Sequence, residues 1–181
     1  MEHFADLWTP EGQALEGRPW PEYPRPSLRR DSFFNLNGPW DFCESPDGRE
    51  PEQYPETITV PFPPESLLSG IHRTFAPGTA LYYRKIFSLP ESLRGDRLFL
   101  HFGAADQAAE VILNGRVLGS HRGGYGSFSF DVTEALRPEN ILVVRIRDPQ
   151  DGGVFPYGKQ RRARGGMWYT PVSGLWQTVW M

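Results

Sequence analysis

The sequence predicts an all-β protein, an antiparallel β-sandwich preceded by an irregular N-terminal arm. Three observations point to this class. Aromatic residues form 14% of the chain beside 19 Gly and 18 Pro, a composition that favours strands and turns over a helical bundle. Short apolar runs recur about every 10–15 residues from residue 80 onward. No amphipathic stretch of about ten residues or more indicates a helical crossover between strands.

The arm is predicted over residues 1–33, because proline recurs there and interrupts helices and central strands alike. Its aromatic residues Trp8, Trp20 and Tyr23 indicate that it lies against an apolar surface, of its own domain or of a neighbour. The predicted division is therefore an arm over 1–33 and a sandwich domain over 34–181.

The first predicted strands are the short run 57–60, the aromatic run 81–87 that ends before Pro90, and the run 97–102 that Gly103 closes. In the next strand, Val111 and Leu113 are expected to face the core. Asn114-Gly115 then predicts a two-residue hairpin turn, because both central residues of such a turn need positive φ.

Three further strands follow the hairpin. The return strand begins at Val117, residues 128–131 alternate Phe with polar residues, and residues 142–147 alternate in the same way. Thr133 is expected to cap one helical turn that reaches Leu136. The last strand is predicted over 175–180. Residues 148–172 are Gly-rich, basic and too long for a simple turn, and loops of this length usually have a function.

Composition excludes several classes of protein. A net charge of −3 and a pI near 5.8 argue against nucleic acid as the main partner. No apolar run approaches the ~18 residues of a membrane span, and residues 1–6 lack a secretory signal, so we expect a cytoplasmic protein. The single Cys43 excludes an internal disulfide and a cysteine-rich zinc site. No cofactor or metal is expected.

Isolated chemical groups give weak signals. Asp106 and Glu110 are the candidate carboxylate pair, although Asp106 is more simply a hydrogen-bonding residue at a loop end and Glu110 a solvent-facing one. The four histidines, His3, His72, His101 and His121, lack the spacing of metal ligands. Residues 123–126 resemble a phosphate loop only superficially, because no helix with a Lys-Ser/Thr pair follows.

The long loop carries the strongest candidates for binding. Trp168 and Tyr169 present flat apolar faces that can stack on a sugar ring, and nearby Lys159 and Arg161 can hydrogen-bond its hydroxyls. The alternative for the aromatic rings is that they plug the end of the sandwich. For the basic run 159–166, the alternatives are binding of phosphate or RNA and a solvated loop.

Several segments in this order and spacing resemble the N-terminal sugar-binding domain of glycoside hydrolase family 2, which includes β-galactosidases, β-glucuronidases and β-mannosidases. They are Leu36-Asn37-Gly38-Pro39-Trp40-Asp41-Phe42, residues 60–66, 83–87, 100–106, 111–115, 121–125, 130–133 and 173–180. The motif residues that we expect to be structural are Asp106, Asn114, Gly115, Gly123, Gly124, Tyr125 and Gly174.

This resemblance implies a jelly-roll, galactose-binding-like sandwich followed by an immunoglobulin-like domain and a (β/α)8 barrel. In the family, both catalytic Glu residues lie in the barrel, and 181 residues cannot hold a sandwich and a barrel of about 250 residues. No catalytic residue is therefore expected here. The expected function is to shape the substrate pocket of a β-galactosidase-like enzyme, and this chain is expected to be inactive alone.

One expected site residue departs from the family pattern. In the galactosidase and glucuronidase branches, this domain lends the active site an Asp shortly before the final Ser/Ala-Gly turn. Counting back from Ser173 without gaps places Trp168 there, which implies stacking or loop packing instead. The lead-in Gly158, Lys159 and Gln160 fits a galactosidase-like branch better than a typical glucuronidase.

Two other functions stay open. The chain can be a stand-alone carbohydrate-binding module, or a domain that assembles a homo-oligomer. For a domain of a larger enzyme, the expected partners are a β-glycoside and the downstream domains, and Trp176 and Trp180 are expected at an exposed surface that meets those domains.

Overall fold

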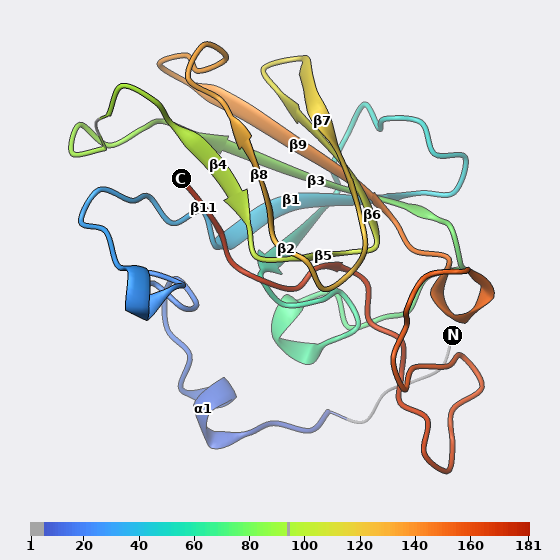
Figure 1. Cartoon of the computed structure of the whole chain (residues 1–181). Helices are drawn as coiled ribbons and strands as arrows, with labels where there is room; N and C mark the ends of the chain where they lie inside the picture. The colour runs from blue at the N-terminus through green and yellow to red at the C-terminus, as the bar shows by residue number, and fades with distance from the viewer. Residues whose placement is uncertain (1–5, 94) are drawn as a thin grey trace.

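The structure is a computed structural model that describes residues 6–93 and 95–181, and its strands form two facing layers (Figure 1). The larger layer is an antiparallel sheet of order β2-β1-β3-β9-β6-β7. Its strands are β1 (Gly38–Ser45), β2 (Glu56–Val60), β3 (Ala80–Phe87), β6 (Ala108–Leu113), β7 (Arg116–Arg122) and β9 (Asn140–Arg147).

The smaller layer has the order β11-β4-β8, with β4 (Phe99–Phe102), β8 (Phe128–Asp131) and β11 (Val179–Trp180). A separate two-stranded pair joins β5 (Ala105–Asp106) to β10 (Gly174–Leu175). Three single 3-10 turns, η1 (Pro26–Leu28), η2 (Leu67–Ser69) and η3 (Gln150–Gly152), lie in the connections. The predicted all-β antiparallel sandwich is confirmed.

The core lies between the layers and follows the predicted alternation. Val111 and Leu113 on β6, like Leu142 and Val144 on β9, are almost fully buried. Aromatic rings extend the core across both layers, with Phe42 and Tyr83 5.1 Å apart and Phe102 stacked 4.7 Å from Phe128. Burial of this apolar area is the main stabilising term for a sandwich of this size.

Asparagine side chains fasten the arm to the body of the domain. Asn35 donates through Nδ2 to the Trp20 carbonyl at 2.7 Å, and Asn37 donates to the Pro19 carbonyl at 3.1 Å. Asn37 also donates to Thr178 Oγ1 and accepts from the amide of Val179. Both asparagines are buried, so these bonds replace the water that their amides would otherwise bind.

The rest of the arm is irregular except for the single turn α1 (Pro10–Gln13), where the Thr9 hydroxyl accepts from the amide of Gly12. Trp20 packs 5.7 Å from Phe62, as expected for an arm that lies against an apolar surface. Residues 1–5, which include His3 and most of the N-terminal segment in which a secretory signal would begin, lie outside the described residues. Among the described helices, none is long and apolar enough to cross a membrane.

The predicted single strand over 175–180 is wrong. The segment divides into β10, which pairs with β5, and β11, which pairs with β4 in another sheet. Between them, Trp176 donates through Nε1 to the Gly124 carbonyl at 2.8 Å, which holds the chain as it passes from one sheet to the other.

Two smaller expectations also fail. Residues 133–135 form a turn and not a helical turn, because Asp131 Oδ1 accepts from both the amide and the hydroxyl of Thr133. The expected exposure of Trp180 is wrong, because it is only 3% exposed and stacks 5.0 Å from His101 in the neighbouring strand, whereas Trp176 is half-buried and keeps part of its surface open.

The predicted hairpin turn at Asn114-Gly115 is confirmed. Both residues have positive φ, 54° and 80°, and Leu113 pairs directly with Arg116. The Asn114 side chain donates to the carbonyl of Ala135 and to Asn140 Oδ1, and accepts from the amide of Ile141. Asn114 therefore satisfies the turn conformation and joins the hairpin to the start of β9.

Replacement of Asn114 separates these two contributions. We expect Asn114→Gly, which keeps the backbone freedom and loses the hydrogen bonds, to lower the free energy of unfolding by about 1–2 kcal/mol. Asn114→Ala loses the same bonds but keeps a Cβ in the left-handed region without the polar side chain that makes this conformation tolerable for Asn, so it should cost roughly 1 kcal/mol more than the Gly variant. Urea denaturation measures both variants, and equal stability of the Gly and Ala variants would contradict the turn's conformational demand.

Candidate functional site

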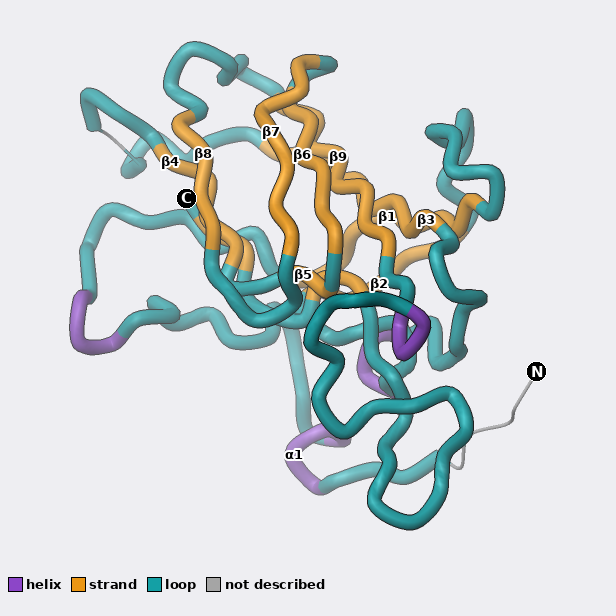
Figure 2. Tube along the Cα trace, turned by 45° about the vertical axis from the view of Figure 1, so that its right-hand side comes forward, coloured by secondary structure: helices purple, strands orange, loops and turns teal. Residues whose placement is uncertain are grey.

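The loop over residues 148–172 covers one end of the sandwich, below β2 and β5 (Figure 2). Several side-chain hydrogen bonds attach it to the sandwich or hold its shape. Gln107, directly after β5, donates through Nε2 to the Pro156 carbonyl at 3.1 Å. Gln160 accepts through Oε1 from the amide of Val172 at 2.7 Å, which closes the loop on itself. We call the region where this loop meets β5, β10 and residues 123–125 the loop end.

The four residues predicted to contact carbohydrate come together on the outer part of this loop. The Tyr169 amide donates to the Lys159 carbonyl at 2.8 Å, and the Arg161 amide donates to the Tyr169 carbonyl at 3.0 Å. The Arg161 guanidinium lies 3.9 Å from the centroid of the Trp168 ring, a cation–π contact. Lys159 and Arg161 are exposed.

The two aromatic rings of this group differ in accessibility. Tyr169 is 69% exposed, whereas Trp168 is half-buried and Arg161 covers one face of its indole. Neither ring belongs to the hydrophobic core, so the alternative in which both plug the sandwich receives no support. Tyr169 is therefore the more open surface on which a flat ligand can stack.

Beneath the loop lie three buried carboxyl groups, Glu65, Asp106 and Asp148, which we call the acid cluster. Their residues are only 6–8% exposed. Glu65 accepts from the amide and the hydroxyl of Ser173, at 3.0 and 2.7 Å. Asp148 accepts from the amide of Gln150 at 2.7 Å. Asp106 pairs in register with Gly174 across β5 and β10.

Burial is the main cause of the altered acidity of the cluster, because a charged carboxylate loses its hydration there. Burial raises the pKa of Glu65 to about 7, and the bonds from Ser173 oppose this rise. Burial and the neighbouring charge of Asp148 raise the pKa of Asp106 to about 7. The pKa of Asp148 is also raised, by burial and by Asp151.

The structure corrects the expected role of Asp106. It is not a hydrogen-bonding residue at an open loop end, since its Oδ1 atom is buried and has no hydrogen-bond partner within the described chain. Glycine is needed opposite it, because a Cβ at Gly124 would lie 2.6 Å from this oxygen. Gly174 is similarly confined, with φ of 81° and no room for a Cβ against the Tyr83 hydroxyl.

The expected motif residues thus fall into two places. Asp106, Gly123, Gly124, Tyr125 and Gly174 meet at the loop end, where the Gly123 amide donates to the Gln107 carbonyl. Asn114 and Gly115 lie at the other end of β6 and act in the hairpin.

The remaining candidates have other environments. Glu110 forms an ion pair with Arg145 at 3.1 Å, whereas Asp106 belongs to the buried acid cluster, so the two carboxyls have different environments. His121 stacks 4.3 Å from Phe128, and its Nε2 lies 3.2 Å from the Gly123 carbonyl. In the part of the chain that the structure describes, no three His, Cys, Asp or Glu side chains are grouped as metal ligands.

Sequence reasoning missed Glu65, Asp148 and Ser173 as a group. Glu65 stands in a Pro-rich connection that reads as exposed, and 108 residues separate it from Ser173. Its burial arises only when the connection after β2 folds over the start of β10. The one local signal is the acidic residue within a segment otherwise composed of Pro, Phe and Ser.

Residues 74–163 match the family described as glycosyl hydrolase 2 galactose-binding domain-like. A β-galactosidase of Thermoanaerobacter pseudethanolicus is 30% identical over 103 residues, 55% of this chain and 13% of that protein. A β-glucuronidase of Paenibacillus borealis is 30% identical over 146 residues, 76% of this chain and 24% of that protein. The chain therefore spans less than a quarter of the length of these relatives.

Solved structures of β-glucuronidases superpose on this chain. The structure of Bifidobacterium dentium β-glucuronidase complexed with coumarin-3-O-glucuronide superposes with a TM-score of 0.61 at 27% identity, over 87% of this chain and 30% of that one. Ruminococcus gnavus β-glucuronidase superposes with a TM-score of 0.64 at 24% identity, over 88% of this chain and 30% of that one, which supports the fold.

The acid cluster predicts a pH dependence of stability. Because the folded state keeps Glu65 protonated between about pH 4 and 7 while the unfolded state has lost that proton, this residue makes stability fall as pH rises through the window. Glu65→Gln keeps an acceptor and a neutral group at Ser173. We expect its unfolding free energy to decline less over this range, by roughly 2 kcal/mol relative to the parent chain.

Urea denaturation at several pH values measures this difference. The matched control is Glu52→Gln, because Glu52 is an exposed carboxylate, and its pH profile should follow the parent chain. Parallel profiles for the parent and Glu65→Gln would show that Glu65 is ionised in the folded state throughout.

Proposed function

We propose that this chain forms a wall of the substrate pocket of a retaining β-glycosidase. The proposal rests on the galactose-binding-like N-terminal domain of glycoside hydrolase family 2 that the chain carries. Residues 34–181 supply this domain, and residues 1–33 form the arm that is fastened to it. The proposed setting is the cytoplasm, a reducing compartment that suits the single unpaired Cys43.

The observation that carries this proposal is the attachment of loop 148–172 to the sandwich. Backbone bonds place the Lys159–Arg161 segment beside Tyr169, and the loop rests on the buried pairs of β5 and β10. An exposed aromatic ring with two basic side chains beside it, held by a rigid scaffold, has the composition of a carbohydrate contact.

In the proposed mechanism, this chain binds and orients the sugar, and the chemistry belongs to a barrel domain of the same enzyme. Tyr169 stacks on one face of the sugar ring, while Lys159 and Arg161 donate to hydroxyl oxygens. Because the Arg161 guanidinium stacks on the indole ring of Trp168, its side chain is held in position to donate to the sugar. A carboxylate nucleophile and a carboxylic acid of the barrel then carry out double displacement through a glycosyl-enzyme intermediate.

The relatives that match this chain include β-galactosidases and β-glucuronidases, so the proposed substrate class is a β-glycoside. A β-galactoside is our first choice. The proposed protein partners are an immunoglobulin-like domain and the barrel, which follow this domain in the family.

Tyr169→Ala tests the binding role in the enzyme that combines this domain with a barrel. Loss of one stacking contact should raise KM by roughly threefold to tenfold, with kcat changed less. Trp168→Ala should have a similar effect, because it removes the support of Arg161. Steady-state kinetics on aryl β-galactosides and β-glucuronides measures both.

Val154→Ala is the control on the same loop, because Val154 is 97% exposed and lies outside the proposed contact group. Its kinetics should match those of the parent enzyme. Unchanged kinetics of the Tyr169 and Trp168 variants on every glycoside tested would remove the pocket-wall role.

The proposal also predicts the size of the native product. Purification from the source cells, followed by intact mass measurement, should give a polypeptide several times heavier than 20.6 kDa. A native chain of 20.6 kDa would contradict the hydrolase assembly and favour a stand-alone carbohydrate-binding module.

A further inference from the structure

A separate pocket lies between residues 74–76 and the inner side of loop 148–172. Its volume is about 390 Å3, within the range of roughly 300–1,000 Å3 that is usual for ligand sites. The apolar part of its wall consists of Phe75, Ala76 and Pro171. The polar part consists of Thr74, Gln150, Arg162, Arg164 and Thr170, and no carboxylate is among the described residues that line it.

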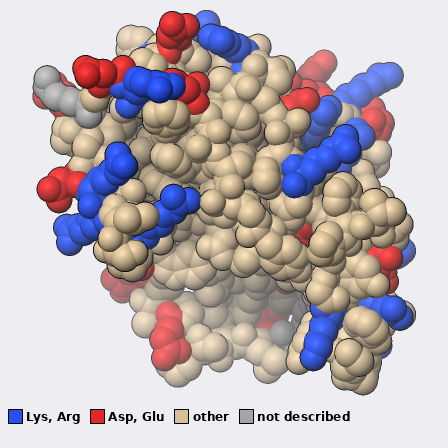
Figure 3. Space-filling model, in the orientation of Figure 1, with Lys and Arg blue, Asp and Glu red and all other residues tan. Residues whose placement is uncertain are grey.

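The charge of this pocket contrasts with that of the protein. The whole chain has a net charge of −3, whereas two guanidinium groups line this one pocket. Figure 3 shows Lys and Arg side chains at the lower right of the view, where this loop lies, and others spread over the rest of the face. Within the described residues, the Arg162 guanidinium has no carboxylate in ion-pair range, and Asp151 contacts the backbone amide of Arg162 instead.

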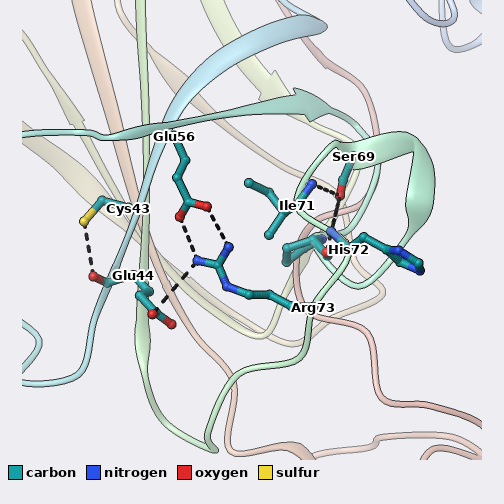
Figure 4. Close-up of polar contacts among 8 residues, drawn as sticks. Cys43, Glu44, Glu56, Ser69, Ile71, His72 and Arg73 are labelled. Atoms are coloured by element: carbon teal, nitrogen blue, oxygen red, sulfur yellow. Dashed lines mark hydrogen bonds and ion pairs between the residues drawn. The ribbon is translucent and has the colours of Figure 1, made fainter. Parts of the chain in front are cut away.

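The two walls of the pocket are fixed by contacts outside it. Arg73, next to Thr74, forms a bidentate ion pair with Glu56 of β2 at 2.6 and 2.7 Å, and Glu44 of β1 lies 3.9 Å away (Figure 4). This pair holds residues 74–76 against the six-stranded sheet. The turn before it is closed by Ser69, whose hydroxyl accepts from the amides of Ile71 and His72.

The opposite wall is held in the same way. Gln150 is buried and donates through Nε2 to the Phe75 carbonyl at 3.2 Å, which joins the loop directly to the first wall. Arg164 donates through Nη1 to Thr170 Oγ1 at 3.2 Å, which joins two residues of this wall to each other.

We propose that this pocket binds an oxyanion carried by a saccharide, either the carboxylate of a uronic acid or a sulfate ester. The planar fork of an arginine matches both groups, and the two threonine hydroxyls add donors for the remaining oxygens. The apolar wall suits the non-polar face of a sugar ring. The saccharide part of this inference rests on the proposed function, since an inorganic anion would need only the guanidinium groups.

Titration of the 181-residue chain with matched sugars tests the inference. Glucuronate is compared with glucose, galactose 6-sulfate with galactose, and inorganic sulfate is the ion without a sugar. The readout is the shift of the Thr74 and Thr170 amide resonances in ¹⁵N-edited NMR spectra at 0.15 M salt. At least one acidic sugar should bind roughly tenfold more tightly than its neutral counterpart, as expected for a charge-assisted hydrogen-bond pair.

Arg162→Gln and Arg164→Gln should each weaken the acidic sugar by fivefold or more and leave the neutral sugars unchanged. The matched control is Arg116→Gln, because Arg116 is an exposed arginine in the β6–β7 hairpin at the other end of the sandwich. Thermal unfolding of all three variants checks that each remains folded. Equal losses in the Arg116 variant would show a general effect of charge and would overturn the pocket.

Three other outcomes also overturn the inference. They are equal binding of acidic and neutral sugars, absence of shifts at Thr74 and Thr170, and an affinity for inorganic sulfate equal to that for the acidic sugar. Neutral sugars that bind at Tyr169 without an acidic preference would reject this pocket and leave the proposed function intact. Preference for the acidic sugar, with no glycosidase activity in the native protein, would reject the proposed function alone.

Discussion

The contact between Glu65 and Ser173 is the constraint on which the loop end depends. One buried carboxyl group accepts from both the amide and the hydroxyl of Ser173, and it thereby fixes where the chain leaves loop 148–172. Gly174 can then enter β10 against Asp106, in a space that admits no side chain beside Tyr83. The positions of the loop, of the Tyr169 ring and of the pocket beneath the loop therefore depend on this attachment. A carboxyl that is difficult to ionise is tolerated there because it is hydrogen-bonded in either state.

The domain separates acidic and basic groups by depth. Three carboxyls lie buried under the loop, whereas four basic side chains of the loop are exposed to solvent, those of Lys159, Arg161, Arg162 and Arg164. Burial lowers the tendency of the carboxyls to carry charge, so the basic side chains above them are less neutralised than the composition suggests. The net charge of the chain therefore says little about the potential that a ligand meets at this loop.

Much of the fold could be predicted because its signals are local. Alternation in 142–147 and the Asn114-Gly115 turn depend on neighbouring residues, and both are as expected. The division of 174–180 into β10 and β11 was not predictable, because it depends on the bond from Trp176 to Gly124, 52 residues away. For the candidate site, composition indicated Tyr169 and its neighbours. It gave no sign of the acid cluster, whose members are joined only by long-range packing.

The fastening of the arm has a consequence for how this protein can vary. Asn35 and Asn37 hold the carbonyls of Trp20 and Pro19, and a carbonyl is a group that every residue supplies. Attachment therefore depends on the path of the main chain and only weakly on which side chains the arm displays. Substitutions on the surface of the arm can therefore change what the arm contacts without loss of the two hydrogen bonds that attach it to the sandwich. The two asparagines, by contrast, have little such freedom.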